Sequence, residues 1–407
     1  MTLSMNPPPD WAALQAEADA PRHLASLVGL PVSAVDTPAL VIDLDAMSRN
    51  LQRMVEFTRK HDVRLRPHAK MHKSAVLARL QMRAGACGVC VQKASEAEVL
   101  AAGGVTDIYI SNEVVAPDKL ERVVALAQRL AAAGGQLAVA VDSLQGVEAL
   151  AAAWSGLVGM PQPVIDVLVE IDVGQGRCGV PPGPAAVALA QAVAQVTGLR
   201  FAGLQAYHGG AQHLRSPQAR RDAIAHSVAA VERTARLIQA AGLTVGLVTG
   251  AGTGTFALEA ASGVYGELQA GSFMFLDADY ARNERDPAQP QFEHALFVKA
   301  QVMSVGPAHA VCDAGHKSHA VDSGLPRVLP LGSGPELVYF NGGDEHGILR
   351  TAQPGQPLPQ LGDVVWLIPG HCDPTVNLHD HMIGITGGLQ RGTVECIIAV
   401  DARGALT

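Results

Sequence analysis

Apolar residues follow two alternating patterns along this chain, short continuous runs and longer stretches with helical spacing. A buried strand is predicted over 37–45, and the next segment, 46–60, has apolar residues spaced as on one face of a helix. Strand-like runs then alternate with alanine-rich helical stretches such as 117–133 and 215–241. Eight of these runs are predicted as strands, at 64–68, 88–92, 107–111, 137–142, 165–172, 201–207, 245–249 and 267–271.

This alternation predicts an α/β fold with parallel strands. Eight strands favour a closed (β/α)8 TIM-type barrel, although the strand count alone leaves an open, doubly wound sheet as the alternative. Polar residues at the strand ends favour the barrel, because the carboxyl ends of its strands form a single face on which active sites are built. Those residues are Lys70, Gln92, Asn112, Asp142, Arg177, Tyr207 and the loop 249–255.

The pattern changes beyond about residue 280. A turn-rich segment at 286–291 is followed by short apolar runs at 296–305, 364–368 and 393–400, which predict a smaller, mostly β domain. The predicted divisions of the chain are a flexible leader over 1–22, a segment with one strand over 23–45, a barrel over 46–279 and a β domain over 280–407.

Composition and charge narrow the class of protein. The 407 residues are 48% apolar, enough for two hydrophobic cores. The formal net charge of -8, without a dense run of Lys or Arg, argues against nucleic-acid binding. The six cysteines are too scattered for a disulfide framework, no apolar run reaches membrane-spanning length, and the start of the chain does not resemble a signal peptide. We therefore expect a cytoplasmic enzyme that contacts neither nucleic acid nor membrane.

A lysine follows the first predicted barrel strand, in the sequence Arg-Pro-His-Ala-Lys-Met-His-Lys at 66–73. A lysine that is partly desolvated beside other cations can lose its proton near neutral pH and attack a carbonyl carbon. Lys70 is therefore the candidate nucleophile, and Lys73 is its local competitor. A solvated basic turn is the alternative interpretation of this motif taken alone.

A glycine-rich loop follows the seventh predicted strand. Its sequence over 249–255 is Thr-Gly-Ala-Gly-Thr-Gly-Thr, in which the glycines permit a tight turn with exposed N–H groups and the threonines add hydroxyl donors. Such a loop can cradle a phosphate, and barrels often place one after their seventh and eighth strands. It lacks the lysine of a Walker motif, and a plain loop is the alternative. The residues predicted to bind the phosphate are Thr249, Gly250, Gly252, Thr253 and Gly254.

A candidate metal site lies at 371–373, where the sequence is His-Cys-Asp. An extended backbone there would direct His371 and Asp373 to one side and Cys372 to the other. One imidazole and one carboxylate, with water or substrate oxygens completing the shell, suit Mn²⁺ or Mg²⁺ better than a closed zinc site. A capped turn before Pro374 is the alternative.

These motifs, with Gly-Gln-Gly-Arg-Cys-Gly at 174–179 and Gln-Ala-Tyr-His-Gly at 205–209, resemble in order and spacing those of the D-threonine aldolase and 3-hydroxy-D-aspartate aldolase family. The resemblance extends over about 37–404. Members of this family are pyridoxal 5'-phosphate (PLP) enzymes with the alanine-racemase type of barrel, fold type III. The resemblance therefore implies bound PLP, pairing of the strand at 37–45 with the β domain, and a homodimer.

The resemblance also implies roles for single residues. Lys70 would hold PLP covalently, with Gln92 and Tyr207 beside the cofactor. Arg177 would hydrogen-bond the pyridine nitrogen, and because arginine keeps its proton, that nitrogen would stay unprotonated. His213 would lie near the substrate's hydroxyl group, where it or a metal-bound water would act as the base.

The implied reaction is a metal-activated retro-aldol cleavage of D-β-hydroxy-α-amino acids, in which D-threonine gives glycine and acetaldehyde. Family members that dehydrate D-serine carry His-x-Cys at the metal position, whereas this chain has the His-x-Asp of the aldolases. Cleavage of 3-hydroxy-D-aspartate to glycine and glyoxylate, and dehydration of a D-hydroxy amino acid, are the alternatives within the fold. A non-catalytic PLP-binding protein is the alternative from another class, but barrel-only proteins of that kind lack a second domain.

Overall fold

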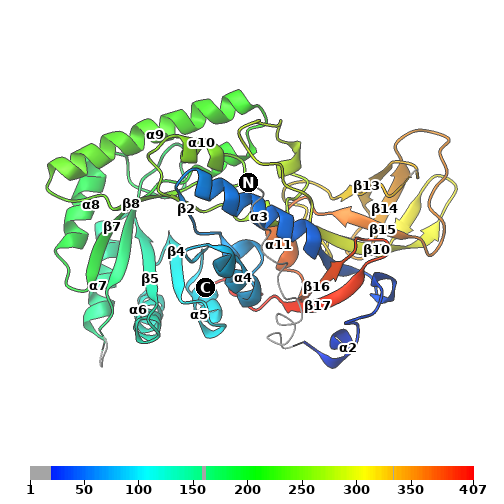
Figure 1. Cartoon of the computed structure of the whole chain (residues 1–407), viewed down its shortest axis with the longest axis horizontal. Helices are drawn as coiled ribbons and strands as arrows, with labels where there is room; N and C mark the ends of the chain where they lie inside the picture. Colours follow the sequence, from blue (N-terminus) through cyan, green and yellow to red (C-terminus); the bar gives the residue numbers. More distant parts are fainter. Residues whose placement is uncertain (1–19, 158–161, 333) are drawn as a thin grey trace, which may run out of the picture. The chain divides into compact units, whose positions relative to one another are not determined.

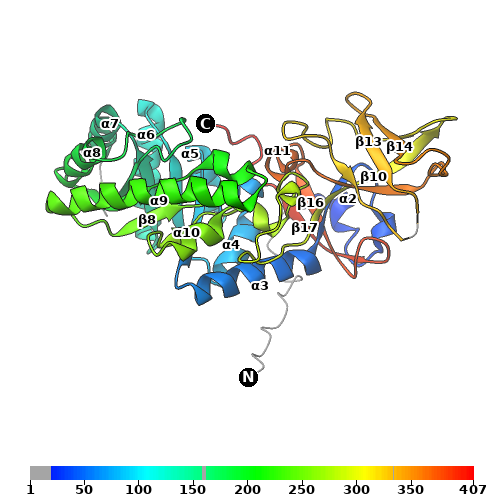
Figure 2. The same ribbon diagram turned by 90° about the horizontal axis from the view of Figure 1, so that it is seen from above.

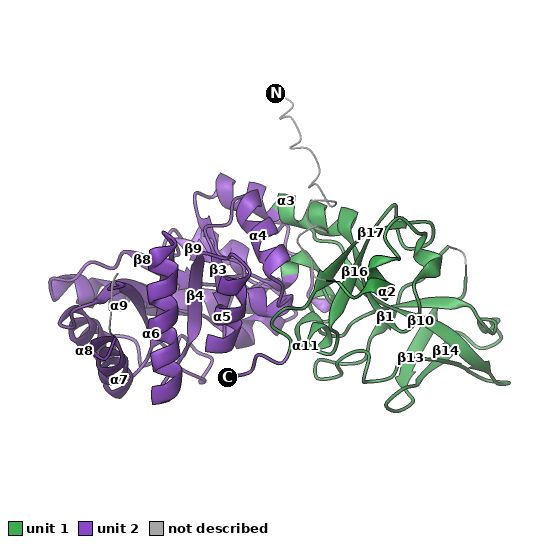
Figure 3. Ribbon diagram, turned by 90° about the horizontal axis from the view of Figure 1, so that it is seen from below, with its two compact units in different colours: residues 1–53, 273–281, 291–403 green, residues 54–272, 282–290, 404–407 purple. Residues whose placement is uncertain are grey.

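The computed structural model describes residues 20–157, 162–332 and 334–407. Most of the predicted leader over 1–22, namely residues 1–19, therefore lies outside the described residues. The chain divides into two compact units, drawn in different colours in Figure 3. Unit 1 comprises 1–53, 273–281 and 291–403, and unit 2 comprises 54–272, 282–290 and 404–407.

Unit 2 is built on an eight-stranded parallel sheet. Its two ends are joined, because the backbone N–H of Cys87 donates to the carbonyl of Leu65 and that of Cys90 to the carbonyl of Pro67, both at 2.9 Å. The predicted barrel class is therefore confirmed, and the open-sheet alternative is wrong. In sheet order the strands are β2 (Arg64–Leu65), β9 (Glu267–Leu268), β8 (Leu247–Gly250), β7 (Leu199–Gln205), β6 (Ile165–Glu170), β5 (Gln136–Val141), β4 (Asp107–Glu113) and β3 (Val89–Val91).

Helices lie outside these strands (Figure 1, Figure 2). They begin as their sequences favour: α6, α8 and α9 each carry proline in the first turn, where its missing N–H is not needed. One apolar cluster fills the layer between helices and strands, with Ile108, Val123 and Val167 among its members. The helices are α4 (Ala75–Ala84), α5 (Ala94–Ala102), α6 (Pro117–Ala132), α7 (Leu144–Ser155), α8 (Pro184–Ala194), α9 (Pro217–Ala240) and α10 (Phe256–Ala261).

The inside of the barrel contains a chain of buried polar side chains. The hydroxyl of Tyr109 donates to Oε1 of Gln205 at 3.1 Å, and Nε2 of Gln269 donates to the same oxygen at 2.7 Å. Glu267 pairs with Nε of Arg66 at 3.1 Å, and both side chains are buried. Buried polar groups are stable only when they have such partners, so this network fixes the side chains that point inward.

Unit 1 contains a nine-stranded sheet. Its strand β1 (Ala39–Asp43) lies between β10 (Leu296–Val305), with which it is antiparallel, and β16 (His381–Thr386), with which it is parallel. Val41, Phe297 and Trp366 are buried in the core of this unit. The remaining strands are β11 (Ala310–Cys312), β12 (Arg327–Val328), β13 (Leu337–Asn341), β14 (Gly347–Thr351), β15 (Val364–Ile368) and β17 (Thr393–Ala399).

Within the described part of unit 1 the helices are α2 (Arg22–Ala25), the start of α3 (Leu44–Lys60), within which the two units divide, and α11 (Cys372–Val376). Short 3-10 turns occur at η1 (Val32–Ala34), η2 (Ala69–Met71), η3 (Gly209–His213), η4 (Ser272–Met274) and η5 (Tyr280–Arg282). Among the described residues, none of the helices has the length and apolar character needed to cross a membrane.

Candidate functional site

Lys70 lies at the mouth of the barrel, in the short turn η2 that follows β2. The backbone just before this turn is fixed to β3. The carbonyl of Pro67 accepts the N–H of Cys90, and His68 forms a parallel β-bridge with the same residue. The lysine side chain is partly exposed. It is therefore placed where the carboxyl ends of parallel strands in a barrel form an active-site face.

The competing lysine is held elsewhere. Nζ of Lys73 lies 2.7 Å from Oε1 of Glu96, and both side chains are buried. The other carboxylate oxygen of Glu96 accepts backbone N–H groups of Gln92 and Lys93 at 2.9 and 3.2 Å. Lys73 thus serves as the counter-ion of a buried carboxylate at the start of α5.

A buried histidine and a glutamine form a hydrogen-bonded pair beside η2. Nε2 of His68 lies 2.8 Å from Nε2 of Gln92, whose amide also contacts the hydroxyl of Ser111 at 3.2 Å. Burial, and then the charge of Lys70, lower the pKa of His68 well below its usual value, so the ring is neutral at physiological pH. The predicted cofactor residue Gln92 is thereby held at the same end of the barrel as Lys70.

The glycine-rich loop at 249–255 begins within the last two residues of β8, and the structure gives a steric reason for two of its glycines. A Cβ atom on Gly250 would lie 2.4 Å from the carbonyl oxygen of Ala206, and one on Gly254 would lie 2.4 Å from that of Gln212. Neighbouring backbone therefore leaves no room for a side chain at either position. The hydroxyl of Thr253 is buried in this loop without a hydrogen-bond partner in the described structure. A buried hydroxyl of this kind fits the oxygen of a bound phosphate.

The hydroxyl of Thr249, a residue also predicted for the phosphate site, is hydrogen-bonded to side chains in the barrel interior. Oγ1 donates to Oε1 of Glu267 at 2.9 Å and accepts from Nε2 of Gln269 at 2.9 Å. Its side chain is fully buried. Thr249 therefore links the loop to the polar network of the barrel interior.

Gln212, which the sequence analysis did not single out, fastens the loop to η3. Its side chain is fully buried. Oε1 accepts the backbone N–H of Gly254 at 3.0 Å, and Nε2 donates to the hydroxyl of Thr255 at 2.8 Å and to the carbonyl of His208 at 3.1 Å. A glutamine in a loop has no sequence signal for this role.

The hydroxyl of Thr255 continues this chain of hydrogen bonds to a buried acid. It donates to Oε1 of Glu259 at 2.7 Å, while Oε2 of Glu259 has no hydrogen-bond partner in the described structure. Burial raises the pKa of Glu259 to about 7. The last residue of the loop is therefore hydrogen-bonded to a carboxyl group that titrates near neutral pH.

Arg177 and Tyr207 come from two loops that are joined to each other. Asp172 organises the first loop by accepting the N–H groups of Gly174 and Gly176 at 2.9 and 3.0 Å. The amide oxygen of Gln175 then accepts the N–H of Gly209 in the second loop at 2.7 Å.

Across this junction the guanidinium carbon of Arg177 lies 5.8 Å from the centre of the Tyr207 ring, within cation–π range. His213 ends η3 in the second loop with an exposed side chain. Arg177 is likewise exposed, so both side chains are accessible from solvent.

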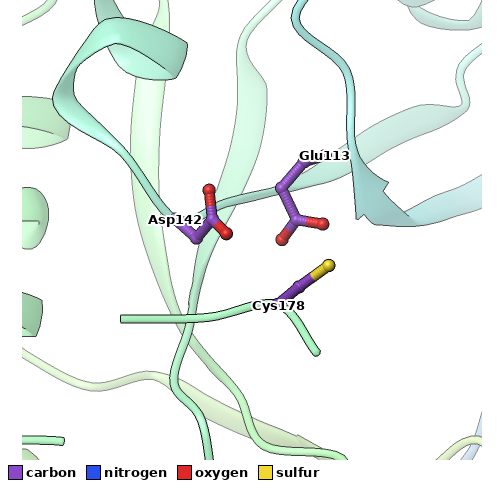
Figure 4. Close-up of side chains that lie close together, drawn as sticks. All are labelled: Glu113, Asp142 and Cys178. Carbon is purple, nitrogen blue, oxygen red and sulfur yellow. The ribbon is translucent and has the colours of Figure 1, made fainter. Parts of the chain in front are cut away.

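An acidic cluster lies at the ends of neighbouring barrel strands. One ligand atom from each of Glu113, Asp142 and Cys178 lies within 4.8 Å of the other two. Figure 4 shows these three side chains close together. Asp142 is already fixed by the N–H of Gly179 at 3.1 Å. Burial, and then the charge of Glu113, raise the pKa of neighbouring Glu170 to about 9, so this region retains a proton at neutral pH.

In unit 1, the predicted metal ligands face each other. Nε2 of His371 lies 3.7 Å from Oδ1 of Asp373, and Cys372 between them is fully buried. The expected extended backbone is wrong beyond His371, however. His371 is extended (φ -143°, ψ 125°), but Cys372 to Val376 form α11, and the N–H of Cys372 is fixed by Asp277 at 3.2 Å.

Acidic side chains surround His371. Its Nδ1 atom lies 2.7 Å from Oδ2 of Asp322. Burial alone would lower the pKa of His371, but the charges of Asp373 and Asp322 outweigh it and raise the pKa. Burial also raises the pKa of Asp277 to about 6. An imidazole and a carboxylate opposed in acidic surroundings form a donor set that fits Mn²⁺ or Mg²⁺.

Comparison with protein families identifies both parts of the chain. Residues 42–279 match the model of the alanine racemase N-terminal domain, and residues 295–385 match that of the putative serine dehydratase domain. The two matches together include the barrel strands and the β strands from β10 to β15.

Individual proteins are similar over nearly the whole chain. A D-threonine aldolase of Arthrobacter sp. is 44% identical over 377 residues, which are 92% of this chain and 95% of that protein. A 3-hydroxy-D-aspartate aldolase of Paracoccus denitrificans is 39% identical over 406 residues, 98% of this chain and 99% of that protein. The crystal structure of D-threonine aldolase from Filomicrobium marinum has a TM-score of 0.87 at 46% identity and covers 93% of this chain and 99% of that one.

Proposed function

The chain belongs to the D-threonine aldolase and 3-hydroxy-D-aspartate aldolase family, and we propose that it is a lyase that cleaves the Cα–Cβ bond of D-β-hydroxy-α-amino acids. D-Threonine would give glycine and acetaldehyde. The observation that carries the proposal is 44% identity to a D-threonine aldolase over 92% of the chain. Cleavage of 3-hydroxy-D-aspartate to glycine and glyoxylate is the second candidate, favoured by 39% identity over 98% of the chain.

The barrel mouth fits PLP. When bound, PLP supplies the electron sink that stabilises the negative charge left at Cα after the bond breaks. Lys70 provides the amine that would hold it, and the ion pair of Lys73 with Glu96 supports that choice. The loop at 250–254 would receive the phosphate, with the buried hydroxyl of Thr253 as one donor.

Arg177 would hydrogen-bond the pyridine nitrogen of PLP. Because a guanidinium keeps its proton, it donates to that nitrogen without protonating it, which limits electron withdrawal by the ring. This suits a cleavage that needs only brief stabilisation of negative charge and disfavours side reactions. Its position 5.8 Å from the centre of the Tyr207 ring supports the role, because it brings the guanidinium beside a second residue proposed to lie next to the cofactor.

His371 and Asp373 would hold a divalent ion, for which we propose Mn²⁺ or Mg²⁺. A bound ion would act as a Lewis acid that lowers the pKa of the substrate's β-hydroxyl group. His213 would take the proton from that hydroxyl, and its exposure leaves the imidazole accessible to the substrate.

The products separate the candidate functions. Purified protein loaded with PLP and Mn²⁺ is incubated with D-threonine, and glycine, acetaldehyde and 2-oxobutanoate are measured. We expect glycine and acetaldehyde in equal amounts. A dehydratase would give 2-oxobutanoate, and a non-catalytic PLP-binding protein would give none of the three. A parallel reaction with 3-hydroxy-D-aspartate, assayed for glyoxylate, ranks the two aldolase substrates by kcat/KM.

The proposal includes a homodimer, on the basis of the family resemblance, and a cytoplasmic location, which is the expectation from the sequence features. Sedimentation of the active protein tests the assembly: activity that sediments entirely as a monomer contradicts it.

A further inference from the structure

One ring nitrogen of His371 is held by a carboxylate from another segment of unit 1. Nδ1 lies 2.7 Å from Oδ2 of Asp322, and the hydroxyl of Ser323 donates to the same oxygen at 3.0 Å. The other nitrogen, Nε2, lies 3.7 Å from Oδ1 of Asp373. The ring is therefore fixed with one nitrogen toward Asp322 and the other toward Asp373.

This arrangement selects the form of the imidazole that can bind a metal. Asp322 can only accept a hydrogen bond, so in the neutral ring Nδ1 carries the proton and Nε2 keeps a lone pair. Two ligand atoms each about 2.1 Å from one ion lie about 3 Å apart when they are adjacent. The observed separation of 3.7 Å is close to that distance and too long for a good hydrogen bond.

The contact does little for folding stability. The side chain of Asp322 is 50% exposed, and an ion pair at such a site contributes only about 0–1 kcal/mol. The backbone near both residues is held without the Asp322 side chain. The hydroxyl of Thr375 donates to the carbonyl of His371 at 2.7 Å and accepts the N–H of Ala320 at 3.0 Å. Removing the carboxylate should leave this part of the fold in place while releasing the ring.

We propose that Asp322 is a positioning residue for the metal site, which fixes the tautomer and orientation of His371 so that Nε2 faces the ion. This inference rests on the proposed function, in which His371 and Asp373 are the metal ligands. Carboxylates that orient a ligating histidine typically contribute 10- to 100-fold to metal affinity. They act on the free protein, before any substrate binds.

The test measures Mn²⁺ affinity without substrate, by electron paramagnetic resonance of the PLP-loaded protein. We expect the dissociation constant to rise about 10- to 100-fold in Asp322→Ala. Asp322→Asn, which keeps one acceptor oxygen, should lose less. The matched control is Asp380→Ala, because Asp380 is also exposed and pairs with Arg403 at 2.6 Å in the same unit. It should bind Mn²⁺ as the parent does.

A second measurement reports on the ring itself. The ¹⁵N NMR shifts of His371 in metal-free protein, recorded at a pH at which the ring is neutral and assigned by their loss in His371→Gln, should show the proton on Nδ1 in the parent and a mixture of tautomers in Asp322→Ala. Unchanged Mn²⁺ affinity in Asp322→Ala, with affinity lost in His371→Ala, overturns the role of Asp322 alone. Unchanged affinity in both variants overturns the proposed metal site as well.

Discussion

Nζ of Lys73 lies 2.7 Å from Oε1 of Glu96 in the interior of the barrel unit. The two lysines of the motif at 66–73 are therefore distinguished by their surroundings, although the sequence places them only three residues apart. Lys73 neutralises a buried carboxylate, whereas Lys70 is partly exposed at the barrel mouth. This difference gives the two lysines opposite predicted phenotypes.

Lys70→Ala should abolish the visible absorbance of lysine-bound PLP and nearly all turnover of D-threonine, because it removes the amine proposed to carry the cofactor. Absorbance spectra of the purified variant after incubation with PLP check the first effect. Borohydride reduction of the parent followed by peptide mass mapping identifies the modified lysine directly.

Lys73→Ala is the matched control for that variant. Its expected defect is stability: an unpaired Glu96 in the interior costs about 3 kcal/mol, as for other broken buried ion pairs. Protein that remains folded should still show the absorbance of bound PLP. The assignment of Lys70 is wrong if Lys73→Ala loses the chromophore while Lys70→Ala keeps it.

The sequence predicted the barrel well because most of its strands are short, largely apolar and bounded by turns. Each of the eight barrel strands overlaps its predicted run, from β2 at 64–65 to β9 at 267–268. A parallel strand is buried on both faces, so its signal is a local run of apolar residues that needs no knowledge of its partners. The regular order of such runs then restricts the topology to few choices.

The geometry of the sites was less predictable because it depends on partners distant in sequence. Gln212 binds the N–H of Gly254 across 42 residues, and His371 meets Asp322 across 49. The turn at His371 was expected to be extended, but Asp277 fixes the N–H of Cys372 from 95 residues away. Pro374 is tolerated in the resulting helix because it lies in the first turn, where its missing N–H is not needed.

Gln212→Ala should weaken PLP binding by roughly tenfold. The substitution removes the acceptor for the N–H of Gly254 and the donor to Thr255, so the loop loses the contacts that fix its shape. A loss of one to two such hydrogen bonds corresponds to about 1 kcal/mol or more. The dissociation constant of PLP, measured by absorbance titration of cofactor-free protein, checks the effect. Gln218→Ala, on the exposed side of nearby α9, should leave PLP affinity unchanged.

Glu259 should make the protein less stable as pH rises. Its pKa is raised to about 7 in the folded state from 4.5, so the unfolded chain loses this proton first. The associated stability is fully present below pH 4.5 and is lost as the pH rises to about 7, a change of about 3 kcal/mol. Glu259→Gln cannot ionise, so its unfolding free energy relative to the parent should improve by about that amount over this range.

Urea unfolding of parent and Glu259→Gln at pH 5 and pH 8 measures this difference. Comparing the two proteins cancels the titration of other groups, including Glu170, whose raised pKa acts in the same direction at higher pH. A difference in unfolding free energy that does not vary with pH would show that Glu259 is already ionised in the folded protein at pH 5.

Removal of the metal should give a yellow, inactive protein. His371 and Asp373 are not among the residues proposed to hold PLP, so chelation should leave the absorbance of lysine-bound PLP intact. His371→Ala and Asp373→Ala should likewise retain PLP but need far more Mn²⁺ for half-maximal activity, because each removes one of two protein ligands. Added glycine should still perturb the PLP spectrum of both variants, since it has no β-hydroxyl group for the ion to activate.

The choice of ion tests the donor set itself. Asp373→Cys replaces an oxygen ligand by a thiolate, and the softer ligand should shift the preference from Mn²⁺ toward Zn²⁺. Activity of EDTA-treated parent and variant, titrated with each ion, measures that shift. Cys372 provides the internal control: it is fully buried beside the site, so Cys372→Ala should leave the ion preference unchanged. Cleavage of D-threonine that survives exhaustive EDTA treatment, or a His371→Ala protein that needs no more metal than the parent, would contradict a metal role for these residues.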